Sequence, residues 1–161
     1  MSDRLRDTVA LLIAATLPLA LGGLGSFATR SSLSLWYRDL DKPAWNPPDW
    51  VFGPVWTVLY VLMGIAAWTV WRIGWHEQRV RLGLVLFGVQ LFGNLLWTWL
   101  FFGLRSPGLA LAEIVVLWVL IVLTTGQFFR INRIGGVLLL PYLIWVSFAS
   151  VLNAAVWYLN Q

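Results

Sequence analysis

The chain has 161 residues, of which 60% are hydrophobic and 11% charged, and its formal net charge at pH 7 is +4. Soluble domains usually carry about 25% charged and about 45–50% apolar residues, so this composition excludes an ordinary water-soluble domain. The mean hydropathy of +0.77 agrees, and the length fits a single domain. Without cysteine, disulfides, thiolate metal sites and thiol nucleophiles are excluded.

Five apolar stretches are long enough to cross a hydrocarbon core of ~30 Å as helices that rise ~1.5 Å per residue. They are continuous and do not alternate between polar and apolar residues, which favours helices over membrane strands. The sequence therefore predicts an all-α integral membrane bundle of five transmembrane helices, forming one domain over 1–161. The expected helices are about 8–29, 53–72, 82–104, 107–129 and 134–158.

The first stretch has two interpretations. Arg4 and Arg6 precede it and Ser26-Phe27-Ala28 resembles a small-residue cleavage site, as in a secretory signal peptide. The apolar run is longer than the ~7–15 residues usual for such a signal, which favours a retained helix. A ladder of small residues four apart would let a neighbouring backbone approach closely. Its members are Ala10, Ala14, Pro18, Gly22 and Ser26.

Two helix starts are marked by proline, whose missing N–H costs nothing at that position. Pro54 is expected near the start of the second helix. Pro107 is expected to open the fourth, with Ser106 as its N-cap.

The basic residues predict the orientation in the membrane. Seven of the eleven lie in the N-terminal tail and in the connections after the second and fourth helices. Because cytoplasmic loops carry the excess of Lys and Arg, the N-terminus is predicted to be inside. A helical bundle of this kind is expected in a bacterial cell (inner) membrane. The charges flank apolar runs, which indicates membrane anchoring and contact with lipid, not nucleic-acid binding.

The connection 30–52 is unusually long and aromatic. Loops of this length without regular structure tend to be functional or disordered. Prolines stiffen this one toward extended geometry, which fits a packed lid. The alternative is an interfacial aromatic belt. The candidate lid residues are Trp36, Lys42, Pro43, Trp45, Asn46, Pro47 and Pro48.

Three helices carry stripes of aromatic, polar and small residues at helical spacing. The amides in them should face the bundle interior, because an unpartnered amide in hydrocarbon is costly. They could act as interhelical hydrogen-bonding groups or line a ligand pocket. The stripes are Trp56, Tyr60, Met63 and Ala67 in the second helix, Gln90, Asn94, Trp97 and Thr98 in the third, and Tyr142, Trp145, Ala149 and Asn153 in the fifth.

Glu113 is the one ionisable side chain well inside a predicted span, which invites a functional interpretation. It could instead reach interfacial water or remain protonated. The only histidine, His76, falls in a short connection, so the parts of a histidine-ligated haem, a zinc hydrolase or a Ser/His/acid triad are missing. No metal and no cofactor are expected.

The aromatic connection and three later blocks resemble one known family, the tryptophan-rich sensory protein/translocator protein (TspO/MBR) family. The resemblance extends from the first connection to the C-terminus. It rests on Trp36-Tyr37 through Lys42-Pro43-x-Trp45-Asn46-Pro47-Pro48, on Trp50-Val51-Phe52-x-Pro54-Val55-Trp56-Thr57-x-Leu59-Tyr60, on Gln90-Leu91-x-x-Asn94-x-x-Trp97, and on Pro141-Tyr142-Leu143-Ile144-Trp145 with Leu152-Asn153.

The resemblance implies a five-helix bundle, often a homodimer, with an aromatic pocket closed by the first loop. Members of the family bind porphyrins such as protoporphyrin IX, cholesterol-like lipids and synthetic isoquinoline carboxamide or benzodiazepine ligands. Mammalian members carry a cholesterol-recognition pattern that needs a basic residue after a tyrosine. Here none follows Tyr158, which puts that sterol site in doubt. The family's pocket residues match Tyr37, Trp56, Asn94, Trp145 and Ala149, and Trp97 lies on the same stripe as Asn94.

Two functions remain open on this basis. The first is a porphyrin-binding protein acting in tetrapyrrole transport, sensing or stress regulation, which needs no enzyme activity. Indole faces suit a flat macrocycle, and Arg30, Arg38 and Lys42 lie on the lid side, where they could pair with its propionates. The second is a light- and oxygen-dependent enzyme that degrades porphyrin, with Trp56 or Trp145 as the candidate catalytic residue.

Overall fold

The computed structural model describes residues 3–34 and 36–161, without the side chains of 3, 4 and 26–34. Within these residues every regular element is a helix, and five helices are long and apolar enough to span a membrane. The predicted all-α membrane bundle is therefore confirmed. The elements are α1 (Asp3–Ser34), α2 (Trp36–Asp39), α3 (Asp49–Trp71), α4 (Gln78–Thr98), the π-helix η1 (Trp99–Gly103), α5 (Pro107–Ile131) and α6 (Arg133–Leu159).

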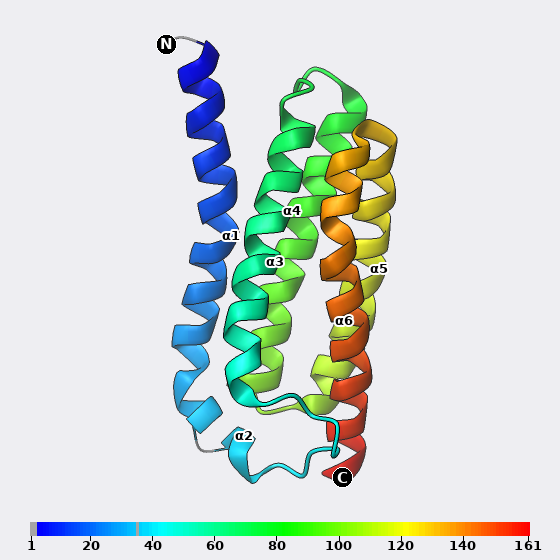
Figure 1. The fold of residues 1–161 in the computed structure, drawn as a ribbon. Coiled ribbons are helices and arrows are strands. Elements are labelled where there is room, and N and C mark those ends of the chain that lie inside the picture. Colours follow the sequence, from blue (N-terminus) through cyan, green and yellow to red (C-terminus); the bar gives the residue numbers. More distant parts are fainter. Residues whose placement is uncertain (1–2, 35) are drawn as a thin grey trace.

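The long helices run up and down beside one another, with α3 to α6 forming a compact group and α1 flanking it (Figure 1). One end of the bundle holds the start of α1 and the connections α3–α4 and α5–α6. The opposite end holds α2, the loop that leads to α3, and the C-terminus. The aromatic connection therefore lies at the end where α6 finishes.

The small-residue ladder of α1 packs directly on α3, as its spacing predicts. A Cβ atom added to Gly64 would overlap the carbonyl of Ala14, and one added to Gly22 would overlap the Tyr60 ring. Pro18, between these two contacts, is buried. The side chain of Ser26, the last member of the predicted ladder, lies outside the described residues.

At the other end of α1 a polar cluster ties it to α3. Arg72 Nε lies 3.2 Å from Asp7 Oδ1, and the Trp68 indole N–H donates to the same oxygen at 3.2 Å. The Arg72 guanidinium also stacks 4.6 Å from the Trp68 ring centroid. Helix α1 is thus held against α3 near its start and along its middle.

Helix α3 begins at Asp49, four residues before the start expected from sequence, so Pro54 lies inside it. Pro48 occupies the N-cap position, and the acidic side chain of Asp49 in the first turn suits the positive end of the helix dipole. Pro54 is close enough to this end that its missing N–H removes only one early hydrogen bond.

Helix α5 begins at Pro107, where the sequence places a helix start. Ser106 holds the N-cap position, but its side chain makes no capping hydrogen bond there. At the start of α6 the Asn132 side chain does cap, accepting from the backbone N–H groups of Ile134 and Gly135.

The three amides expected in the interior are there. Gln90, Asn94 and Asn153 are each no more than 2% exposed. The Tyr60 hydroxyl donates to Asn94 Oδ1 at 2.7 Å, and Asn94 Nδ2 donates to the Tyr142 hydroxyl at 3.4 Å. Asn94 therefore joins three helices. The buried amide atoms of Gln90 have no hydrogen-bond partner among the described residues.

Candidate ligand pocket

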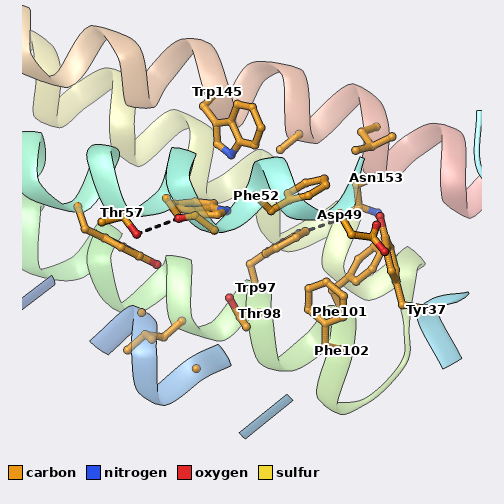
Figure 2. Close-up of a pocket in the computed structure, with 18 of the residues that line it drawn as sticks. Tyr37, Asp49, Phe52, Thr57, Trp97, Thr98, Phe101, Phe102, Trp145 and Asn153 are labelled. Carbon is orange, nitrogen blue, oxygen red and sulfur yellow. Dashed lines mark hydrogen bonds between the residues drawn. The ribbon is translucent and has the colours of Figure 1, made fainter. Parts of the chain in front are cut away.

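A cavity of about 700 Å³ opens between α1, α3, α4 with η1, and α6, at the end of the bundle that α2 covers. Figure 2 shows aromatic side chains entering it from opposite sides. Its volume falls in the range of about 300–1,000 Å³ that is usual for pockets of drug-sized ligands.

One wall of this cavity is built by α3 and α6. Trp56 stacks on Tyr60 one turn further along α3, with ring centroids 5.3 Å apart and planes inclined by 30°. Phe52, one turn before Trp56, meets the Trp145 ring of α6 edge-on at 5.9 Å. The i, i+4 spacing of Phe52, Trp56 and Tyr60 places all three on one face of α3. Ala149 follows Trp145 by one turn and also lines the cavity.

The facing wall comes from the end of α4 and from η1. Trp97 stacks on Phe101 at 5.2 Å, and Phe102 packs edge-on against both rings. The backbone N–H of Leu104 donates to the carbonyl of Trp99, five residues back, which marks the wider π-turn. Trp97, Phe101 and Phe102 all line the cavity (Figure 2).

Tyr37 of α2 covers one end of the cavity and is itself buried. Its ring packs edge-on against Phe101 and Phe102. Burial raises the pKa of the Tyr37 hydroxyl, and the nearby Asp49 carboxylate adds to this, whereas the hydrogen bond with Asn46 lowers it. The hydroxyl therefore stays protonated at neutral pH and donates to Asn46 Oδ1 at 3.4 Å.

Polar groups are few and lie mostly toward the covered end. Arg38 and Asp49 bring one charge of each sign to the lining, and both are solvent-exposed at its rim. Deeper in, the Trp97 indole N–H donates to Asn153 Oδ1 at 3.0 Å (Figure 2). Within 3–34 and 36–161 no group of three or more His, Cys, Asp or Glu could hold a metal ion. The lining can stack on flat rings and pair with one acidic group at the rim.

Comparison with known proteins identifies the family. The sequence profile of the TspO/MBR family matches residues 14–159. The chain belongs to the TspO/MBR family. It is 49% identical to the tryptophan-rich protein TspO of Chlorobaculum tepidum over 95% of this chain and 96% of the relative. It is 41% identical to the tryptophan-rich sensory protein of Cereibacter sphaeroides, over 87% of this chain and 88% of that protein. It is 36% identical to the translocator protein of Bos taurus, over 91% of this chain and 88% of the relative.

Most residues expected in the family's pocket meet in this cavity. Tyr37, Trp56, Trp97, Trp145 and Ala149 all line it. Asn94 is not among the lining residues. Its amide lies behind Tyr60, whose hydroxyl uses the amide oxygen as acceptor, so the ring separates it from the cavity.

The candidate lid residues support the cavity without lining it. Trp36 packs on Phe101, and Trp45 packs on Phe148 of α6. Lys42 Nζ sits 4.7 Å from the centroid of the Tyr37 ring and donates to two backbone carbonyls. Asn46 accepts from the Tyr37 hydroxyl, and its backbone N–H and Nδ2 donate to the carbonyls of Pro43 and Pro47. The Pro48 carbonyl accepts from the backbone N–H of Val51 at the start of α3.

The loop is also shorter than expected, because α1 continues to Ser34 and α3 begins at Asp49. Of the cations predicted at the rim, Arg38 lines the cavity and Lys42 is engaged with Tyr37. The side chain of Arg30 lies outside the described residues.

The sequence interpretation missed part of the lining. Phe52 was noted only as part of the aromatic loop motif, Phe101 and Phe102 were not singled out, and the contribution of α1 through Gly22, Gly23 and Gly25 was not expected. The run from Trp97 to Phe102, with four aromatic residues in six, was the available signal for an aromatic wall in this segment. Of these three glycines only Gly22 was part of the predicted small-residue ladder, and the spacing of that ladder indicated packing alone.

Proposed function

We propose that this cavity binds a porphyrin of the protoporphyrin IX type, or another flat hydrophobic molecule, and that the protein acts in tetrapyrrole transport, sensing or stress regulation. The observation that carries the proposal is the pair of aromatic walls, with Trp56 and Trp145 facing Trp97 across one cavity of about 700 Å³. Each stacked aromatic pair adds ~0.5–1.5 kcal/mol beyond the burial of area. A sterol-like lipid fits this cavity less well than a porphyrin, because its saturated rings gain less from stacking on indole side chains.

The charges at the rim support an acidic ligand. Arg38 is exposed at the opening, where a propionate could remain partly hydrated while it pairs with the guanidinium. The names of the bacterial and mammalian relatives, tryptophan-rich sensory protein and translocator protein, are consistent with a sensory or transport role.

Porphyrin titration of the purified protein tests the proposal. Trp56→Ala and Trp145→Ala should each weaken protoporphyrin IX binding about thirtyfold, since losing a central stacked indole typically costs ~2 kcal/mol. Trp145→Phe should weaken it less, because a smaller ring still stacks. The shift of the porphyrin absorption band reports binding without depending on tryptophan fluorescence.

Trp75→Ala is the matched control, because Trp75 lies in the exposed α3–α4 connection at the far end of the bundle. If Trp56→Ala and Trp145→Ala bind as tightly as Trp75→Ala, porphyrin does not bind in this cavity. Arg38→Gln should weaken protoporphyrin IX more than its dimethyl ester, which lacks the two carboxylates.

A second candidate function is light- and oxygen-dependent breakdown of the bound porphyrin, since three indoles line one cavity. Irradiating the complex in air should then convert the porphyrin absorption to that of a new product, and Trp56→Phe or Trp145→Phe should slow the conversion. Loss of absorption at the rate seen for free porphyrin in detergent would exclude this activity.

The proposal includes a homodimer, as the family resemblance implies, and residence in a bacterial inner membrane, where a helical bundle is expected. Mass analysis of the detergent-solubilised protein tests the dimer, and membrane fractionation tests the location.

A further inference from the structure

The last residues of α6 are tied to the aromatic loop by one side chain. The backbone N–H of Asp41 donates to Asn160 Oδ1 at 3.0 Å, and Asn160 Nδ2 donates back to the Asp41 carbonyl at 2.9 Å. The amide of Asn160 therefore pairs with both backbone groups of one residue, 119 positions away. Its Nδ2 also donates to the carbonyl of Val156 at 2.7 Å, which fixes the side chain on the last turn of α6.

Few other contacts could replace this pair at the chain end. Tyr158 and Leu159, the residues just before Asn160, are 76% and 45% exposed. Figure 1 shows the loop between α2 and α3 passing beside the C-terminus. Further along, the loop touches α6 again where Trp45 packs on Phe148 at 5.9 Å.

The loop contacts residues that cover one end of the cavity. Lys42, the residue after Asp41, places its ammonium 4.7 Å from the Tyr37 ring and donates to the Arg38 carbonyl at 3.3 Å. Asn46 receives the hydrogen bond of the Tyr37 hydroxyl. Tyr37 and Arg38 both line the cavity, and so does Val156, whose carbonyl Asn160 uses. The Asn160 amide thus links the covering of the cavity to its α6 wall.

We infer that Asn160 is a positioning residue that clasps the loop 40–48 to the end of α6, and that releasing this clasp is a step in ligand exchange. The inference rests on the proposed function, because it takes the cavity as the ligand site. Opening the clasp lets Tyr37 and Arg38 move away from the cavity with the loop. Both entry and exit of the ligand then pass through the opened form.

The kinetic consequence separates a clasp from an ordinary pocket contact. Two exposed hydrogen bonds contribute modestly, so Asn160→Ala should raise the dissociation rate of protoporphyrin IX ~3–10-fold. The association rate should rise as well, leaving Kd changed less than either rate. A residue that only stabilised the bound ligand would raise the dissociation rate alone.

The experiment uses the full chain in nanodiscs loaded with protoporphyrin IX. Dissociation is measured as transfer of porphyrin to an excess of lipid vesicles that contain no porphyrin. Association is measured after the ligand-free protein is mixed with protoporphyrin IX, and porphyrin fluorescence reports both rates. Gln161→Ala, one residue further along, is the matched control and should leave both rates and the melting temperature unchanged. Because the chain has no cysteine, Asp41→Cys with Asn160→Cys can be joined by a short bifunctional thiol reagent. The joined protein should exchange ligand more slowly than either single variant.

Hydrogen exchange of the Asp41 amide tests the clasp without any ligand. In Asn160→Ala this amide should exchange faster than in the parent, because its acceptor is gone. Unchanged exchange at Asp41, or unchanged rates in both the Asn160→Ala and the joined protein, would overturn the inference. If protoporphyrin IX fails to bind the parent protein, the proposed function fails, while Asp41 exchange still decides whether Asn160 holds the loop.

Discussion

The indole N–H of Trp97 donates to Asn153 Oδ1 at 3.0 Å, and Asn153 Nδ2 donates onward to the carbonyl of Pro107 at 2.8 Å. The Asn153 side-chain amide thereby joins the C-terminal half of α6 to the end of α4 and the start of α5. Asn153 is 2% exposed, so its amide has few alternative partners. The junction lies directly against the cavity, which both Trp97 and Asn153 line.

Replacing Asn153 should therefore destabilise the bundle. Asn153→Leu keeps the volume roughly constant but removes the partners of two partly buried groups, the Trp97 indole N–H and the Pro107 carbonyl, at ~1–3 kcal/mol. Thermal unfolding in detergent should show a melting temperature several degrees lower. Val151→Leu, on the exposed face of the same helix, is the control and should change little. Equal melting temperatures for the two variants would mean that the amide junction does not stabilise the fold.

The contact of α1 with α3 gives a prediction about packing. Gly22→Leu should lower the melting temperature, because even a Cβ there would overlap the Tyr60 ring, and overpacking costs ~1–3 kcal/mol. Gly23→Ala is a sharp control, since a Cβ at Gly23 meets nothing within 4 Å. It should be neutral or slightly stabilising, as alanine favours helix over glycine. Similar losses in both variants would contradict the specific contact with Tyr60.

Much of the fold was predictable because lipid imposes a simple rule on the backbone. Every apolar run had to form a helix, so five runs gave five spans. Pro107 marked a helix start that the structure also has, since proline at that point loses no hydrogen bond. The interior position of Gln90 and Asn153 followed from the cost of burying an amide in hydrocarbon.

The parts that sequence reasoning missed depend on contacts between segments that are far apart. The π-turn of η1 adds one residue to a helical turn, and the spacing of apolar residues before Trp99 does not predict it. Helix α3 begins at Asp49, five residues ahead of Pro54, and accommodates the proline with the loss of one backbone hydrogen bond. The position of Asn94 behind Tyr60 follows from a hydrogen bond between residues 34 positions apart. Helical spacing puts both side chains on inward faces but does not say which one reaches the cavity.

The orientation in the membrane is a separate prediction that rests on the basic residues alone. Ala44 and His76 lie at opposite ends of the bundle, and both are exposed. With the N-terminus inside, Ala44→Cys should react with an impermeant thiol reagent in intact cells, and His76→Cys only after the membrane is opened. The parent chain has no cysteine and serves as the unlabelled negative control. The reverse labelling pattern would place the N-terminus outside.

Asn94 provides a test of whether it acts from behind the cavity or within it. Its amide accepts from Tyr60 at 2.7 Å and donates to Tyr142 at 3.4 Å, and it is 2% exposed. Asn94→Ala should therefore lower stability by ~0.6–2 kcal/mol through lost interhelical hydrogen bonds. Its effect on porphyrin affinity should stay well below that of Trp56→Ala, because the Tyr60 ring still lines the cavity. Tyr60→Phe keeps the ring and removes only the Tyr60–Asn94 hydrogen bond, so it should likewise lower stability while largely sparing porphyrin affinity. A thirtyfold loss of affinity in Asn94→Ala with an unchanged melting temperature would instead put the amide in direct contact with the ligand.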